Sequence, residues 1–368
     1  MTISRRKMIA LVGGGFVVAA GSAAGGFVAT RRPNAALAPW EAAGGYAAPR
    51  MAALSWAILA PNPHNRQPWL AELVGADRVR IWREAARNLP ETDPFDRQMT
   101  IGMGCFLELF RQAAAEQGQI AQMDLFPEGE DGPVADITLV TGGTPDPLFQ
   151  FALSRHTNRL AYEDRVPEEA ALSVMSPEAS EIITDPDRVD ALRALTRNAM
   201  HIEMHTHRTH MESINLTRLG KREIEANPDG ISVRGAVQEA LIVAGMITRE
   251  GQADQASAEF AQTVDFVLSA QDASPAYLTI KTAGNARLDQ IEAGRQWLRV
   301  HLAATSAGVA MQPLSQALQE YPEQAELYAA VHEMLAEPGE TIQMLGRIGY
   351  AASVGPSPRW PLESRIIG

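Results

Sequence analysis

Two stretches of this 368-residue chain share one pattern of small residues, and this internal match limits the possible folds more than any single motif does. Each stretch has apolar residues at helical spacing and is followed by an apolar run, so each predicts a long helix that leads into a strand. The matching positions are Gly104, Ala113, Ala114 and Gly118 in the first stretch and Gly294, Ala303, Ala304 and Gly308 in the second, at one constant offset in residue number. A duplicated module explains the match, and coincidence among common residues is the alternative.

Length and charge agree with two acidic globular domains. At roughly 150 residues per domain, the chain is long enough for two. The formal charge is −12, but residues 1–40 hold five basic and no acidic side chains, so the rest of the chain holds 27 basic and 44 acidic ones. An acidic body without a basic run repels phosphate backbones, and no nucleic-acid partner is expected. Cys105 is the single cysteine, which excludes an internal disulfide; we expect it to be a buried spectator.

The N-terminus predicts an export segment. Ser4-Arg5-Arg6-Lys7 precedes an uncharged, Gly-rich stretch over residues 8–30, which is typical of a signal for the twin-arginine export machinery. That route carries folded proteins, so it suits a periplasmic protein that acquires a cofactor first. An ordinary secretory signal and a buried N-terminal helix are the alternatives. Pro39 follows the small-x-small site at residues 36–38 and would hinder cleavage, so a retained membrane anchor stays open.

The rest of the chain predicts an α+β protein with mixed or antiparallel sheets. We expect a signal and tether over 1–38, a first module over 39–147 and a second module over 148–368 that contains a helical insertion over about 186–250. Helical spacing and turn residues predict helices over 49–59, 99–116, 186–226, 232–249 and 288–306, strands within 69–82, 136–140 and 342–350, and Pro/Ala/Gly-rich tethers over 31–48 and 141–147.

The decapeptide over residues 60–69 carries the strongest chemical signal. Its three prolines exclude a helix, and its Asn, His and Gln side chains offer donors and acceptors from a stiffened loop at a helix end. Such a loop can present amides to a flat polar heterocycle. A well-capped turn with Trp69 in the core is the alternative.

This segment resembles the loop of the flavin-dependent nitroreductase family in which a Pro-Ser-x-x-Asn-x-Gln-Pro-Trp pattern packs against FMN. The resemblance implies a cofactor-binding role for Asn62, Pro63, His64, Asn65 and Gln67, with Asn62 replacing the usual Ser. A second stretch is similar to the Arg-rich opening of the family, which holds the FMN phosphate and ribityl chain. Its residues here are Arg155, His156, Thr157 and Arg159.

The C-terminal part resembles the family as well. Residues 303–309 are similar to the end of its central helix, and Leu314, Ser315 and Gln316 are similar to the segment that approaches flavin N5. Arg359 matches the tail arginine that reaches the phosphate. The resemblance implies that Arg155 and Arg359 bind the phosphate and that Arg159 lies near N1, where a cation raises the electron affinity of the flavin. For each arginine, a surface ion pair is the alternative.

The order of these motifs is informative because the loop precedes the Arg-rich opening, which reverses the order in ordinary nitroreductases. Two fused nitroreductase-like modules explain the reversal, with one FMN site per chain between the halves and a monomeric pseudo-dimer. The layout resembles the Acg-type subfamily of exported or mycobacterial nitroreductase-like proteins. It implies an FMN-dependent oxidoreductase that takes electrons from a small donor, with NAD(P)H as one candidate, and passes them to nitroaromatics or quinones. A lidded flavin-storage protein and a cofactor-free interaction module are the alternatives.

Two weaker signals do not change this interpretation. His201, His205, His207 and His210 fall within one predicted helix and could share a metal, but a solvated or flavin-covering helix is the simpler interpretation. The stretch 227–230 predicts a turn and lacks the spaced acidic ligands of a calcium loop.

Overall fold

The computed structural model describes residues 30–368. The predicted export motif at Arg5 and Arg6 and nearly all of the uncharged stretch after it lie outside this part of the chain. No helix within residues 30–368 is long and apolar enough to cross a membrane.

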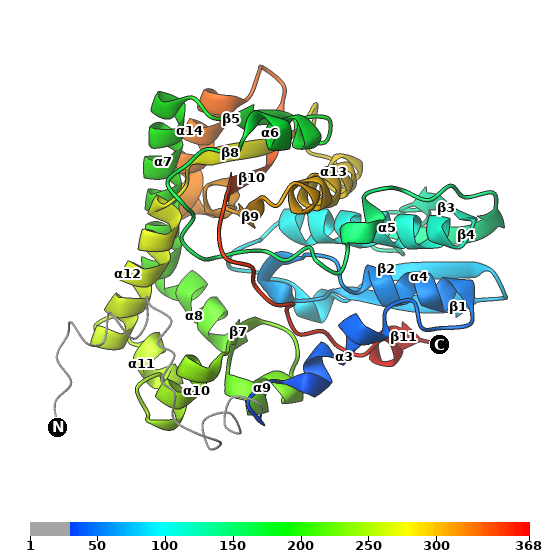
Figure 1. Cartoon of the computed structure of the whole chain (residues 1–368), viewed down its shortest axis with the longest axis horizontal. Coiled ribbons are helices and arrows are strands. Elements are labelled where there is room, and N and C mark those ends of the chain that lie inside the picture. Colours follow the sequence, from blue (N-terminus) through cyan, green and yellow to red (C-terminus); the bar gives the residue numbers. More distant parts are fainter. Residues whose placement is uncertain (1–29) are drawn as a thin grey trace.

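The first half builds a five-stranded sheet in the order β11-β1-β2-β4-β3. Its strands are β1 (Trp69–Val74), β2 (Arg78–Arg83), β3 (Gln119–Leu125), β4 (Ala135–Thr141) and β11 (Ile366–Ile367). Neighbours in this sheet pair antiparallel except β11, which comes from the chain end and pairs parallel with β1. Figure 1 shows the tail after β10 returning across the molecule to reach this edge.

The second half builds a four-stranded antiparallel sheet in the order β5-β8-β10-β9. Its strands are β5 (Glu181–Ile183), β8 (Ala276–Thr282), β9 (Ala310–Pro313) and β10 (Thr341–Gly349). Apart from the segment between β5 and β8 and the helix over Ala325–Leu335 between β9 and β10, each half runs strand, strand, long helix, strand, strand, with sheet order first, second, fourth, third. This shared topology confirms the predicted α+β class and the two similar modules, because a chance match of small residues would not reproduce it.

The two central helices, α5 (Arg97–Glu116) and α13 (Arg287–Ser306), cross in the interior where the halves meet. A Cβ built on Gly104 would lie 2.2 Å from Ile291 O, and one built on Gly294 would lie 2.0 Å from Ile101 O. Ile101 and Ile291 are separated by the same offset as the two glycines. The contact is therefore reciprocal, as across the two-fold axis of a homodimer.

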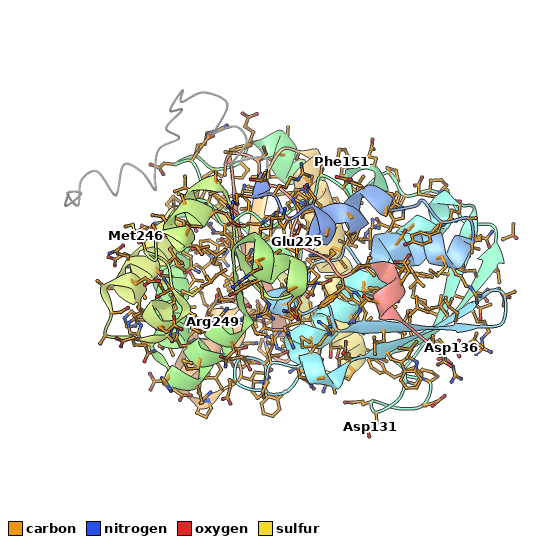
Figure 2. The ribbon with its side chains drawn as sticks, turned by 90° about the horizontal axis from the view of Figure 1, so that it is seen from below. Asp131, Asp136, Phe151, Glu225, Met246 and Arg249 are labelled. Atoms are coloured by element: carbon orange, nitrogen blue, oxygen red, sulfur yellow. The ribbon has the colours of Figure 1, made fainter. Side chains whose placement is uncertain are left out.

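One long insertion distinguishes the second module. Three residues, 75–77, join β1 to β2, whereas residues 184–275 join the corresponding β5 and β8. These residues form α7 (Pro186–His205), α8 (His207–Leu216), α9 (Gly220–Ala226), α10 (Ala236–Val243), α11 (Arg249–Ala253), α12 (Ala258–Asp272) and the parallel pair β6 (Thr217–Leu219) and β7 (Ile231–Val233). In Figure 2, Met246 of this insertion and Asp136 of the first sheet lie toward opposite ends of the molecule.

The remaining helices are short or peripheral. They are α3 (Asn34–Ala42), α4 (Pro49–Ala57), α6 (Glu169–Met175) and α14 (Ala325–Leu335), with 3-10 turns at Pro63–Asn65, Ala85–Arg87, Phe149–Phe151, Gln316–Leu318, Pro322–Gln324 and Leu362–Arg365. The helices predicted over 49–59, 99–116 and 288–306 and the strands within 69–82, 136–140 and 342–350 are confirmed. The module boundary predicted at residues 147 and 148 falls between β4 and β5 and stays a prediction.

Three sequence expectations are wrong. The segment 31–48 is not a tether, because α3 forms there and buries Leu37 and Trp40. The helix over 186–226 is broken into α7, α8 and α9, since the Thr206 backbone is extended and β6 follows α8. The insertion runs to about residue 275 rather than 250, and the helix expected over 232–249 shrinks to α10 because strand β7 comes before it.

Candidate functional site

The loop between α4 and β1 has a strained backbone. Among residues 30–368, five residues other than glycine have a positive φ, and three of them, His64, Asn65 and Gln67, lie in this loop at 47° to 51°. A side chain in the left-handed region costs about 1 kcal/mol or more, so surrounding contacts must hold it there. Strain of this kind concentrates at binding sites, which makes the loop the centre of the candidate site.

Hydrogen bonds of its own Asn and Gln side chains hold the loop. Asn62 Oδ1 accepts from Gln67 N at 2.7 Å. The Gln67 side chain, which is fully buried, donates to Pro228 O of the insertion at 2.7 Å and accepts from Trp360 N of the tail at 2.9 Å. Asn65 Nδ2 donates to Pro358 O at 3.1 Å. Gln67 and Asn65 thus join the loop to the insertion and the tail, and the role of these amides in FMN binding stays a prediction.

Arg359 closes the C-terminal end of α4. Its Nε donates to Ile58 O, its Nη2 donates to Leu59 O and Ala60 O, and its Nη1 donates to Asn65 Oδ1 at 2.6 Å and to Pro358 O. Carbonyls at a helix C-terminus carry partial negative charge, so a cation is favourable there. All five donor hydrogens of Arg359 have a protein acceptor.

Arg155 lies beside Arg359 and is only 3% exposed. Its Nη2 donates to Leu59 O at 3.1 Å, the same carbonyl that Arg359 uses, and its Nη1 lies 3.4 Å from His301 Nδ1. Its Nε is buried and has no hydrogen-bond partner among the described residues. A buried unsatisfied donor is costly, so this guanidinium has capacity for a further acceptor.

Burial disfavours the charge on both arginines, and repulsion by Arg155 adds to this effect on Arg359. Desolvation lowers the pKa of Arg155 to about 10, and desolvation together with the charge of Arg155 lowers the pKa of Arg359 to about 9. Both groups remain cations at neutral pH. Within residues 30–368, neither forms an ion pair with a carboxylate, although the chain as a whole is acidic. Two buried cations without a counter-charge favour binding of an anion.

Two histidines, His64 and His156, lie close to arginines of the candidate site. Desolvation, followed by the charges of Arg159 and Arg66, lowers the pKa of His64 to about 4, and desolvation with nearby arginines lowers that of His156 to about 4. Both imidazoles are therefore neutral at pH 7. His64 Nε2 lies 3.3 Å from Ser213 Oγ of the insertion.

Arg159 is exposed to solvent, yet desolvation by surrounding protein lowers the pKa of its guanidinium. It has no hydrogen bond or ion pair with the described residues, so its donors are available to a ligand. Thr157 is half-buried, and its hydroxyl has no protein partner in the same range. In the Arg-rich opening, two polar side chains thus have no hydrogen bond to the described residues. In the nearby loop, most polar side chains already bond to protein groups.

The segment over Leu314–Gln316 lies beyond β9. The opening reaches β9 through Asn158 N, which donates to Met311 O at 3.1 Å. Leu314 is buried and its N donates to Leu345 O at 2.8 Å, while Gln316 O accepts from Gln319 N, whose side chain donates to Glu203 of α7. Ser315 O accepts from Leu318 N and closes a 3-10 turn. In the described chain, no hydrogen bond joins this segment to Arg155, Arg359 or the loop.

The insertion binds the loop through a charged cluster that sequence reasoning missed. Asp229 is buried and accepts from Arg66 at 2.8 Å, Arg87 at 3.0 Å and Arg218 at 2.9 Å. Gly230 N donates to Asn65 O at 3.2 Å. The turn predicted over 227–230 therefore docks against the strained loop, and its Asp is the one signal that could have indicated an ionic partner.

Two further residues, which lie near Arg359 or His156, had little or no sequence signal. Trp40 stacks edge-on against His156 at 5.1 Å between ring centroids, and Arg359 lies over its ring at 5.4 Å. An aromatic residue in a Pro/Ala-rich stretch was the only sign of its burial. Arg234 of the insertion acts electrostatically on His156, and nothing in its sequence context distinguishes it from a surface arginine.

Cys105 and the histidines of α7 and α8 belong to other elements of the fold. Cys105 is buried, as expected, and desolvation raises the pKa of its thiol to about 12. His201 and His205 stack at 3.9 Å on α7, and His210 bonds to Gln252 O. Within residues 30–368, no three His, Cys, Asp or Glu side chains are grouped so that they could hold a metal ion.

Comparison with known proteins finds relatives that are named as nitroreductases. The chain is 24% identical over 324 residues to "Putative NAD(P)H nitroreductase Rv3131" of Mycobacterium tuberculosis strain H37Rv, which covers 85% of this chain and 89% of that protein. The protein of the same description from strain CDC 1551, MT3217, matches to the same extent. These relatives support the resemblance to the nitroreductase superfamily. No protein-family model matches the sequence.

Solved structures give a weaker likeness. A nitroreductase with bound FMN from Bacteroides fragilis has a TM-score of 0.33 and 10% identity, covering 56% of this chain and 89% of that one. One from Desulfitobacterium hafniense has a TM-score of 0.34 and 12% identity, covering 61% and 98%. The two-module fold of this chain rests on its own topology and not on these scores.

Proposed function

We propose that this chain is an FMN-binding oxidoreductase of the nitroreductase type, with one FMN per chain that passes electrons to small acceptors such as nitroaromatics or quinones. The observation that carries the proposal is the pair of buried guanidiniums, Arg155 and Arg359, beside a strained loop and without a carboxylate partner in the described chain. The similarity to mycobacterial proteins named as NAD(P)H nitroreductases extends over most of the chain.

The donor set fits a flavin mononucleotide. A phosphate group is a dianion or nearly so, and it would neutralise the cationic cluster and accept from the unpartnered Nε of Arg155. The uncommitted Arg159 would hold its positive charge near the flavin ring and favour its reduced, anionic form. When bound, FMN supplies the hydride and electron chemistry. The protein contributes binding and orientation, and no side chain is required as a proton donor.

Absorbance spectroscopy and cofactor titration test this function. Protein purified after native export should be yellow or should bind added FMN with quenching of flavin fluorescence, and it should bleach anaerobically with NAD(P)H or a small artificial donor. Arg155→Ala should weaken FMN binding about 10- to 100-fold through loss of a charge-assisted hydrogen bond, and Arg359→Ala should weaken it through loss of charge. Unchanged binding in both variants would show that the site lies elsewhere.

Flavin storage with little turnover is a second candidate, favoured by the docking of the insertion. The turn over 227–230 bonds to the loop, and Ser213 lies 3.3 Å from His64 Nε2, so the insertion is placed to cover this side of the site. Bound flavin that no donor bleaches would support storage over catalysis. A colourless protein that binds no added flavin would support neither function.

We also propose that the chain is exported by the twin-arginine machinery to the periplasm and works as a monomer. Arg5 and Arg6 support the route, and the reciprocal crossing of α5 and α13 already supplies, within one chain, the contact that a dimer would provide. Replacement of both arginines by lysine should retain the protein in the cytoplasm, and light scattering should give the mass of one chain. Nicotinamide nucleotides are scarce outside the cytoplasm, so a different small donor is also to be tested.

A further inference from the structure

Arg234 has N–H groups without a hydrogen bond to the described residues, and it lies near the cationic cluster of Arg155 and Arg359. It lies between β7 and α10 of the insertion and is half-buried. Its Nη2 donates to Pro356 O and, at 3.5 Å, to Gly355 O, both in the tail just before Arg359. Its Nε and Nη1 have no hydrogen bond within residues 30–368. Like Arg155 and Arg359, it forms no ion pair with a described carboxylate.

Several contacts place Arg234 with the other two arginines. Trp40 Nε1 donates to Ser357 O at 2.8 Å. This bond fixes the tail at a point between the two carbonyls that accept from Arg234 and the side chain of Arg359. The same Trp40 ring contacts His156 and lies under Arg359. The positive charges of Arg155, Arg359 and Arg234 all act on His156. Three guanidiniums from three separate segments therefore lie within electrostatic range of one neutral imidazole.

The three arginines differ in how many of their N–H groups remain available for a ligand. Arg359 uses all five donors on Ile58, Leu59, Ala60, Asn65 and Pro358, so it has none left for a ligand. Among residues 30–368, Arg155 has no partner for its buried Nε, and Arg234 has none for its Nε and Nη1. A guanidinium with two available N–H groups can bind a phosphate bidentately, which strengthens the contact.

We propose that Arg234 donates to the phosphate of the bound flavin mononucleotide together with Arg155, while Arg359 contributes charge and holds the loop. This inference rests on the proposed function. Because Arg234 belongs to the insertion, the phosphate joins the insertion to the body of the protein. The chain would therefore distinguish FMN from riboflavin partly through a residue that lies outside both repeated modules.

The test compares FMN with riboflavin, which lacks only the phosphate. Flavin fluorescence titrations of Arg234→Ala should show FMN affinity reduced about 10- to 100-fold and riboflavin affinity unchanged. Arg234→Lys keeps the charge but loses the planar fork, and should fall between the wild type and Arg234→Ala. Arg222→Ala is the matched control, because Arg222 is an exposed arginine of the same insertion, and it should change neither affinity.

The outcomes distinguish this inference from the proposed function. Unchanged FMN affinity in Arg234→Ala, or an equal loss for FMN and riboflavin, overturns the role of Arg234 while the flavin site stands. If the wild type binds no flavin, the proposed function fails and inorganic phosphate becomes the probe. If phosphate raises the unfolding temperature of the wild type but not of Arg234→Ala, an anion contact by Arg234 would still be supported. The same rise in the wild type and in Arg234→Ala, or no rise in either, would refute that contact.

Discussion

Replacement of Gly104 by alanine tests the close crossing of the two central helices. Alanine in the middle of a helix normally stabilises a protein by about 1 kcal/mol relative to glycine. Here the new methyl group would lie 2.2 Å from Ile291 O and 2.9 Å from Gly294 Cα. Both are backbone atoms, so no side-chain rotation relieves the overlap, and α5 and α13 must separate.

The two effects have opposite signs and can be compared. Overpacking a well-packed core costs up to about 3 kcal/mol. The free-energy cost of separating α5 from α13 by about 1 Å is at the upper end of that range. After the gain of about 1 kcal/mol from helix propensity, the net loss should be about 2 kcal/mol of unfolding free energy. Gly294→Ala should cost a similar amount, because its Cβ would meet Ile101 O at 2.0 Å.

The assay is urea unfolding followed by tryptophan fluorescence, with thermal unfolding as a second measurement. Gly102→Ala is the matched control in the same helix, since its Cβ would lie 3.2 Å from side-chain atoms of Asn62 and Pro63 and should disturb the protein less. The double variant Gly104→Ala/Gly294→Ala should lose less than the sum of the single losses, because helices separated by one methyl group admit the second. A stability of Gly104→Ala equal to or above that of the wild type would refute the crossing.

Three other changes have definite expected results. Asp229→Ala should lower the unfolding free energy by about 3 kcal/mol, because it leaves Arg66, Arg87 and Arg218 partly buried around a missing charge; a loss below about 1 kcal/mol, typical of surface pairs, would contradict this. Glu203 has its pKa raised to about 7, chiefly by burial, so it folds with a proton that the unfolded chain releases above pH 4.5. Its contribution, of the order of 3 kcal/mol, is complete below that pH and disappears as the pH rises through 7. Glu203→Gln should flatten the dependence of the unfolding free energy on pH between 4.5 and 7, and an unchanged slope would assign that dependence to another group. Cys105, with a thiol pKa raised to about 12 by burial, should resist maleimide labelling in the folded protein and react in denaturant; rapid labelling of the native state would show that it is accessible.

Local sequence patterns predicted the elements of the two modules well. The helices over 99–116 and 288–306 have strong apolar periodicity and no proline, and Gly118 and Gly308 end them with positive φ. The insertion was predicted less well. Its short helices bury few residues, α10 buries only Glu239 fully, and their ends depend on contacts such as that of Asp229 with the loop.

The candidate site was predicted as a set of residues but not as a set of contacts. The loop over 60–69 and the Arg-rich opening could be identified because polar residues among prolines form an unusual pattern. Which of their donors remain available for a ligand could not be predicted. Arg359 and Gln67 are committed to backbone groups that lie far away in the sequence, and Arg234 is recruited from the insertion.

The kinds and order of residues alone set the acidic charge, the candidate loop and the repeat of small residues at a constant offset, because composition, turn chemistry and helical periodicity are local properties. The three-dimensional structure was needed to show that the repeated glycines face each other, that the two sheets share one strand order, and that three arginines from distant segments lie near one histidine without a described carboxylate partner. Each of these depends on packing between segments far apart in the chain. Whether a buried charge needs a ligand depends on its neighbours in space, and the order of residues does not specify them.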